Sequence, residues 1–202
     1  MSGVVIIGSG HAGCNTAVNL RRSGFDKSIK IFTSESELPY HRPPLSKKFF
    51  KKEVLFEKIL LKEPDFYLKN EIEIYTDTPI VKVNIKEKYV ETKDGEKVEF
   101  SQLVFATGTS SRKLSDGIYK DINILYLRNI FDVNQIHKKL EQSKKPLLIG
   151  GGYIGLELAA SMQEMGLSVS IIELEDRLLK RVTSSVMSDF YKKLHEDRGV
   201  KI

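Results

Sequence analysis

Residues 4–25 read VVIIGSGHAGCNTAVNLRRSGF, and residues 147–167 read LLIGGGYIGLELAASMQEMGL. In both stretches a short apolar run leads into a G-x-G-x-x-G loop and then into a helix-forming segment that stops at a glycine. The loop glycines keep a constant separation of 142 residues, pairing Gly8, Gly10 and Gly13 with Gly150, Gly152 and Gly155. The sequence therefore predicts the same strand–loop–helix element twice, each followed by a second parallel strand.

A glycine loop in this position has a physical purpose. The first glycine allows a tight turn, the second lets a pyrophosphate approach the backbone, and the third lets the helix pack closely on the strand. The free N–H groups and the partial positive charge of the helix N-terminus favour phosphate. One such loop is weak evidence, but two loops in full context favour two bound dinucleotides.

Acidic residues near the end of the following strand indicate which nucleotides bind. Glu173 stands 21 residues after Gly152, where a carboxylate accepts hydrogen bonds from a ribose 2′-OH and repels a 2′-phosphate. In the first element the acidic residue stands further along the chain, where Glu35 follows Ser34. This glutamate could also be merely solvated. Two dinucleotides in one chain suggest FAD at the first site and NADH at the second.

The remaining pattern predicts an α/β fold with two Rossmann-like βαβ nucleotide-binding domains and a small antiparallel sheet insertion. The first domain is expected at residues 1–110 and the second at residues 111–202. Further strands and one helix are expected from the apolar periodicity: antiparallel strands across 72–90 and 97–100 with a hairpin at Asp94-Gly95, a buried strand at 103–108, a strand at 122–129 and a helix at 131–143.

Composition narrows the function classes. The 202 residues carry a net charge of +5 with lysines spread in short clusters, and no basic stretch is interleaved with stacking aromatics, so we expect no nucleic-acid partner. No run approaches the roughly 20 apolar residues of a membrane span, and we expect a cytoplasmic protein. The single cysteine, Cys14, excludes a disulfide within the chain and is expected to be a small packed residue. The four histidines are too scattered to predict a metal site.

Four stretches resemble one family. The family is the FAD-dependent, NADH-linked reductases of ferredoxin, rubredoxin and Rieske-type proteins, within the pyridine nucleotide-disulfide oxidoreductase superfamily, whose relatives include apoptosis-inducing factor. The stretches that resemble it are GHAG at 10–13, LPYHRPPLSK at 38–47, ATG at 106–108 and GGGYIGLELAA at 150–160. The similarity runs the whole length of the chain. The RPPLSK segment is its most specific element.

The resemblance implies roles for individual residues. Lys47 would lie near the isoalloxazine ring and pair with Glu157, and Tyr153 would gate the flavin face. The residues implied on the FAD side are Gly8, Gly10, Ala12, Gly13, Ser34, Glu35, Arg42, Lys47, Ile80, Ala106, Thr107, Gly108 and Arg128. Those implied on the nicotinamide side are Gly150, Gly152, Tyr153, Ile154, Gly155, Glu157 and Glu173, with Arg177 and Arg181 equally well explained as surface charges.

The resemblance also implies an electron path. Disulfide reductases of the superfamily carry a cysteine pair where this chain has LPYHRPPLSK, so electrons should leave singly, to a ferredoxin, rubredoxin or Rieske-type iron–sulfur protein. Monodehydroascorbate and nitrite reductase components share these motifs and stay open as alternatives. The family's chains are about twice as long, so a non-catalytic dinucleotide-binding fragment is the other alternative, and the isolated chain is then expected to hold little FAD.

Overall fold

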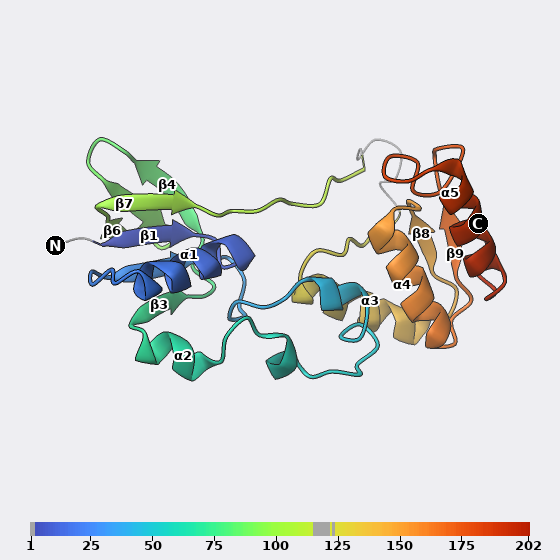
Figure 1. The fold of residues 1–202 in the computed structure, drawn as a ribbon, viewed down its shortest axis with the longest axis horizontal. Helices are drawn as coiled ribbons and strands as arrows, with labels where there is room; N and C mark the ends of the chain where they lie inside the picture. The colour runs from blue at the N-terminus through green and yellow to red at the C-terminus, as the bar shows by residue number, and fades with distance from the viewer. Residues whose placement is uncertain (1–2, 115–121, 123) are drawn as a thin grey trace. The chain divides into compact units, whose positions relative to one another are not determined.

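The computed structural model describes residues 3–114, 122 and 124–202. The chain forms two compact units, the first made of Met1–His41 and Phe56–Ser110 and the second of Arg42–Leu55 and Ser111–Ile202 (Figure 1). Residues 42–55 fall inside the range expected for the first domain but pack with the second unit, and we call them the strap. The chain therefore passes between the two units three times.

A parallel sheet forms the centre of the first unit. Its strands run in the order β3 (Ile72–Tyr75), β2 (Ile29–Phe32), β1 (Val4–Ile7) and β7 (Gln102–Phe105), and every neighbouring pair is parallel. β1 and β2 are almost continuously apolar because both of their faces are buried.

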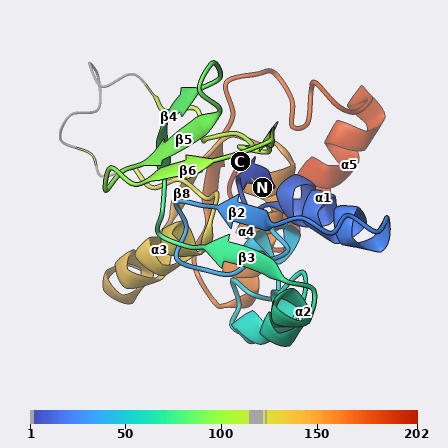
Figure 2. The ribbon, with the colours of Figure 1, turned by 90° about the vertical axis from the view of Figure 1, so that its left-hand side faces the viewer.

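Layers of different kinds cover the two faces of this sheet. On one face, Val4 and Ile6 pack with residues of α1 (His11–Arg22) and with Tyr67 of α2 (Pro64–Lys69). On the other face, Val5 packs against an antiparallel sheet, which lies above the parallel strands in Figure 2. That sheet contains β4 (Ile80–Asn84), β5 (Tyr89–Thr92) and β6 (Lys97–Glu99).

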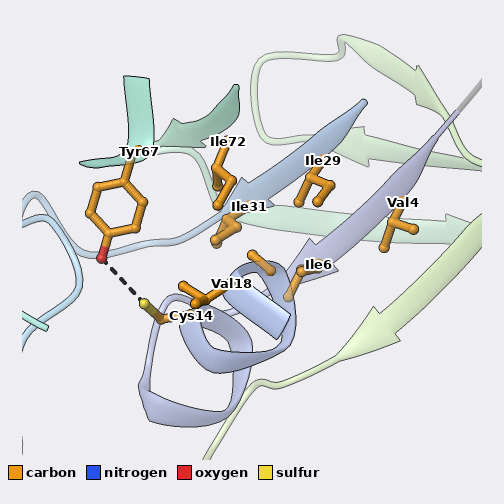
Figure 3. Packing of buried hydrophobic residues seen from close by; sticks show 9 residues of the cluster. Val4, Ile6, Cys14, Val18, Ile29, Ile31, Tyr67 and Ile72 are labelled. Carbon is orange, nitrogen blue, oxygen red and sulfur yellow. Dashed lines mark hydrogen bonds between the residues drawn. The ribbon is translucent and has the colours of Figure 1, made fainter. Parts of the chain in front are cut away.

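Cys14 is part of the first core, as expected for a packed residue. It is buried, and its Sγ lies 3.2 Å from the Tyr67 hydroxyl (Figure 3). Burial raises the pKa of the Cys14 thiol. This effect outweighs the hydrogen bond with Tyr67 and the charge of Lys62, which both lower the pKa. Its burial and its raised pKa together make this thiol unreactive in the folded chain.

We therefore expect a thiol-specific aromatic disulfide reagent to modify Cys14 at least about a hundredfold more slowly in the folded chain than in the chain unfolded by guanidinium, because the reagent must wait for opening of the core. Release of the coloured thiolate measures both rates. Equal rates would show that the packing of α1 on the sheet does not protect Cys14 in solution.

The second unit contains the second βαβ element. β8 (Leu147–Ile149) leads into α4 (Tyr153–Glu164), and the chain returns in β9 (Ser170–Ile172), which pairs with β8 in parallel. α3 (Ile130–Gln142) precedes this element and begins at a capping box between Asn129 and Asp132. α5 (Ser185–Glu196) follows it.

Three expectations need correction. Residues 72–75 form a strand of the parallel sheet and not of the antiparallel insertion, because Ile72 and Ile74 extend the core beside β2. β7 is only half-buried, with Phe105 62% exposed, because it is the outermost strand of the described sheet. Among the described residues 124–129 no strand forms; Asn123 lies outside the described residues.

The loop expected at 38–47 contains one turn of 3-10 helix, η1 (Pro43–Ser46), in which proline fixes the first position. A second 3-10 turn, η2 (Phe56–Ile59), begins where the chain returns to the first unit.

Candidate functional site

The first glycine loop lies between β1 and α1. Gly8 has φ +109°, which side chains rarely tolerate, and a Cβ added at Gly13 would stand 1.9 Å from the Gly8 carbonyl oxygen. Both glycines are therefore required by the fold itself. Gly10 differs, because its φ is −67° and an added Cβ would meet no atom within 4 Å.

The second loop, between β8 and α4, repeats this arrangement. Gly150 has φ +107°, and a Cβ at Gly155 would lie 2.1 Å from the Gly150 carbonyl oxygen. Gly152 caps α4 with φ −81°, and the space around its missing side chain is open. Neither backbone strain nor packing explains glycine at positions 10 and 152. Open space at a helix N-terminus is what close approach of a pyrophosphate requires.

Other expected residues of the first unit lie at the carboxyl ends of adjacent strands. Ser34 and Glu35 follow β2, and residues 106–108 follow β7, on either side of the loop that follows β1. Glu35 is not merely solvated, because the Tyr40 hydroxyl donates to its carboxylate at 2.5 Å. Its main-chain carbonyl accepts from Asp77 N at 3.0 Å, just before β4 begins at Ile80.

Residues 106–108 and the first turn of α1 lie at the same edge of the sheet. Ala106 N donates to the Ile7 carbonyl at 2.8 Å, and Gly108 has φ +66°. Ala12 is exposed in the first turn of α1. The strand ends therefore bring Gly8, Glu35 and Ala106 to one edge of the parallel sheet, where nucleotides bind in open α/β sheets.

Glu173 lies directly after β9 and turns back to the second loop. Its Oε2 accepts a hydrogen bond from Gly151 N at 2.6 Å, and its Oε1 accepts one from Glu175 N at 3.0 Å. Partial burial opposes ionisation, but donation by the N–H groups of Glu175, Gly151 and Leu174, with Arg181 nearby, lowers the pKa of Glu173. The group is a fixed anion beside the glycine loop at neutral pH.

The helix that follows the second loop begins with two exposed side chains. Tyr153 and Ile154 are each 56% exposed, and they occupy the first two positions of α4. Exposure leaves both side chains accessible to a ligand held at this helix terminus.

The strap carries Arg42 and Lys47, which the resemblance implies on the FAD side but which belong to the second unit. Lys47 Nζ lies 2.7 Å from Glu157 Oε2, so the contact implied by the family resemblance is present. Arg42 Nη1 donates to the Arg128 carbonyl at 3.0 Å. Positions 42, 47 and 128 thus all belong to the unit that carries the second glycine loop.

Sequence reasoning missed several residues that hold the strap. Ser46 Oγ donates to Glu157 Oε2 at 2.6 Å, and Ser161 Oγ donates to the Ser46 carbonyl at 2.7 Å. His137 Nε2 is 2.9 Å from the Phe50 carbonyl oxygen, and the two rings stack. The spacing of Glu157 and Ser161, one helical turn apart, was the available signal, but nothing in the sequence indicated their partner.

A second ion pair lies further along the same strap. Lys51 Nζ lies 2.6 Å from Glu164 Oε2 and 2.8 Å from Glu53 Oε1. Hydrogen bonds to Glu164 and then to Glu53 raise the pKa of Lys51. The strap therefore meets α4 at three successive positions of one helix face.

Arg177 and Arg181 differ in their surroundings. Arg177 donates to the Thr183 carbonyl, the Ser188 hydroxyl and the Lys180 carbonyl, so it stabilises the turn before α5. Arg181 is 85% exposed and pairs weakly with Glu175 at 3.6 Å. Arg177 is committed to structure, while Arg181 remains accessible.

Two of the histidines are closer in space than in sequence. His11 Nε2 lies 3.0 Å from His41 Nδ1, at the start of α1. Within the described part of the chain no cluster of three or more histidine, cysteine or acidic side chains has metal-binding geometry. The described helices include none that combines the length and apolar character needed to cross a bilayer.

A family model described as pyridine nucleotide-disulphide oxidoreductase matches residues 2–202. The chain belongs to this family. Among curated relatives, it is 37% identical over 199 residues to a ferredoxin–NAD(P)(+) reductase of Sphingomonas, covering 98% of this chain and 48% of that protein. It is 36% identical over 198 residues to a rubredoxin–NAD(+) reductase of Ectopseudomonas oleovorans, covering 98% and 51%.

Solved structures give the same result. The reductase in the covalent putidaredoxin reductase–putidaredoxin complex is 35% identical, with a TM-score of 0.92, and the match covers 100% of this chain and 49% of that one. The NADH:rubredoxin oxidoreductase of Clostridium acetobutylicum is 30% identical with a TM-score of 0.89, over 100% and 52%. The chain thus spans about half the length of these relatives.

Proposed function

We propose that the protein carrying this chain is a flavoprotein oxidoreductase that takes hydride from NADH onto FAD and delivers single electrons to an iron–sulfur protein of the ferredoxin, rubredoxin or Rieske type. The observation that carries the proposal is the open space at Gly10 and Gly152, where the fold has no internal need for glycine. Membership of the family and the names of its reductase relatives support the same chemistry.

In this proposal the first unit holds FAD and the second unit holds NADH. The N-terminal N–H groups of α1 and α4 would receive the two pyrophosphates. Ser34, Glu35, Ile80 and the 106–108 segment would contact the flavin nucleotide, and Arg42 and Arg128 would approach it. Bound FAD supplies hydride acceptance and one-electron release, whereas the protein supplies position and charge.

The charged residues of the second unit have two separate tasks. Glu173 would hold the ribose hydroxyls of NADH and repel a 2′-phosphate, for which its backbone hydrogen bonds already orient it. Lys47 would place a cation where negative charge grows as hydride is accepted, and Glu157 would hold that cation in place.

The electron acceptor and the compartment are the last parts of the proposal. The segment 38–47 contains no cysteine, which argues against a disulfide acceptor at this position and for one-electron transfer to an external protein. For the compartment we propose the cytoplasm, since the sequence has no run long and apolar enough to span a bilayer.

The proposal is tested with the gene product that contains these residues, purified with FAD added. It should be yellow, and NADH should bleach the flavin absorbance under anaerobic conditions. Subsequent addition of ferredoxin or rubredoxin should restore the colour with one electron per acceptor. A protein that binds FAD but is not bleached by NADH would contradict the proposal and favour a dinucleotide-binding role without turnover.

Replacing Lys47 by alanine should slow flavin reduction by NADH about tenfold or more, because the cation opposite the developing charge is lost. The thermal midpoint should move by less than about 2 °C, since exposed ion pairs contribute little to stability and Pro43 and Pro44 shape the segment. Stopped-flow absorbance measures the rate. A trace indistinguishable from that of the parent protein would show that Lys47 has no role in hydride transfer.

A further inference from the structure

The strap lies along one face of α4, where three side chains of the helix, about one turn apart, contact it. Glu157, Ser161 and Glu164 occupy positions i, i+4 and i+7 of the helix and therefore share a face. They contact Ser46 with Lys47, the Ser46 carbonyl, and Lys51 in that order. The strap is thus fastened to the helix that begins at the second glycine loop.

The charged pair in this contact is not itself buried. The side chains of Lys47 and Glu157 are 48% and 34% exposed, and an ion pair in that setting is held only weakly by its own attraction. The two serines differ, because each is only 5% exposed. The fixed geometry of the Lys47–Glu157 pair must therefore come from the buried serines.

The two serine hydroxyls make two separate hydrogen bonds between the strap and α4. Ser161 Oγ donates to the Ser46 carbonyl at 2.7 Å, which fixes the strap backbone on α4. Ser46 Oγ donates at 2.6 Å to the same Glu157 oxygen that receives Lys47 Nζ at 2.7 Å. Two donors on one oxygen fix the direction of that carboxylate, and a hydrogen bond to an ionised group is stronger than a neutral one.

We propose that Ser46 and Ser161 are positioning residues that hold the Lys47–Glu157 pair in the geometry used for hydride transfer. The inference rests on the proposed function for its catalytic consequence. Ser46 acts on the carboxylate directly, and Ser161 acts through the Ser46 backbone. Both serines, Lys47 and Glu157 belong to the second unit, so the pair is held by contacts within one unit.

A hydrogen bond that holds a reacting group matters because misplacement of that group is costly. Small displacements of a catalytic side chain lower rates strongly even when the fold is intact. Loss of a hydrogen bond to a charged group corresponds to a change of roughly 10- to 100-fold. We expect Ser46→Ala to fall at the lower end of this range, since Lys47 still pairs with Glu157.

The first experiment needs no flavin. The 202-residue chain is treated briefly with an acylating reagent, and mass spectrometry compares modification of Lys47 with that of the exposed neighbour Lys48. Ser46→Ala and Ser161→Ala should raise the Lys47 to Lys48 ratio about threefold or more, because the ammonium is held less often. Ser46→Thr, which keeps the hydroxyl, should restore the parent ratio.

A matched control removes a contact from the same helix face and leaves both serine hydrogen bonds in place. Glu164→Gln breaks the pair with Lys51 and should leave the Lys47 ratio and the flavin reduction rate unchanged. If the Lys47 ratio is the same in the parent chain and in both alanine variants, the serines do not position the pair and the inference is wrong.

The second experiment uses the FAD-loaded gene product. Ser46→Ala should lower the rate of flavin reduction about tenfold with little change in the apparent NADH dissociation constant, and Ser46→Thr should recover most of the rate. An unchanged rate in a variant with raised Lys47 labelling would overturn the positioning role. A parent protein that NADH does not reduce would refute the proposed function instead, while the labelling result would still decide the serine contacts.

Discussion

NADPH should become nearly as good a reductant as NADH once Glu173 is replaced by glutamine. In the parent protein the Glu173 carboxylate is fixed by Gly151 N and Glu175 N, and its lowered pKa keeps it charged at neutral pH. An anion held there repels a 2′-phosphate, and like charges brought together cost several kcal/mol. We therefore expect NADH to be preferred by roughly 100-fold in the parent and by less than about tenfold in the variant.

The measurement is the rate of flavin bleaching at limiting concentrations of each reductant. Glutamine has nearly the same shape and can still accept one of the two backbone hydrogen bonds, so the strand end should keep its path. Glu196→Gln, on α5, changes the net charge equally and should leave the preference unchanged. A parent protein with equal rates for the two reductants would refute the role given to Glu173.

Gly13→Ala should lower the free energy of unfolding of the 202-residue chain by about 3 kcal/mol, at the upper end of the usual cost of overpacking. The new Cβ would stand 1.9 Å from the Gly8 carbonyl oxygen and 3.3 Å from Ile6 Cγ2. The nearer atom belongs to the backbone and cannot rotate away. The helix or the loop must move, which separates α1 from β1.

Gly10→Ser is the matched control for this substitution. Its Cβ would meet no atom within 4 Å, and serine is a good residue at a helix N-cap, so stability should change by less than about 0.5 kcal/mol. Urea unfolding followed by circular dichroism measures both variants. A Gly13→Ala chain within 1 kcal/mol of the parent would contradict the close packing described for this loop.

The repeated motif made both βαβ elements predictable. A short apolar run, a glycine loop and a helix between two glycines are local signals, and β1 with α1 and β8 with α4 formed where these signals stood. Cys14 was also predicted as a packed residue, from its place just after Gly13 at the start of the helix. The position of Glu173 followed from its distance to Gly152.

Pairing partners were less predictable. Residues 72–75 have the composition of any half-buried strand, and the sheet that they join is decided by pairing with β2, whose partner residues stand 43 positions earlier, as in Ile29 with Ile72. Residues 124–129 are apolar enough for a strand, yet none forms among the described residues of this stretch. A strand also needs a partner with free backbone groups, and composition does not say whether one is present. Local composition does not contain this information.

The sequence by itself determined the two glycine loops, the acid that follows the second, and the family through its RPPLSK segment. Only the tertiary structure decided that the strap carrying Lys47 packs on α4, because that contact joins Ser46 to Glu157 and Ser161 across more than 100 residues. The same holds for the difference between Gly10 and Gly13, which look alike in the motif. One faces open space and the other a carbonyl oxygen, and only the packing of helix on strand separates them.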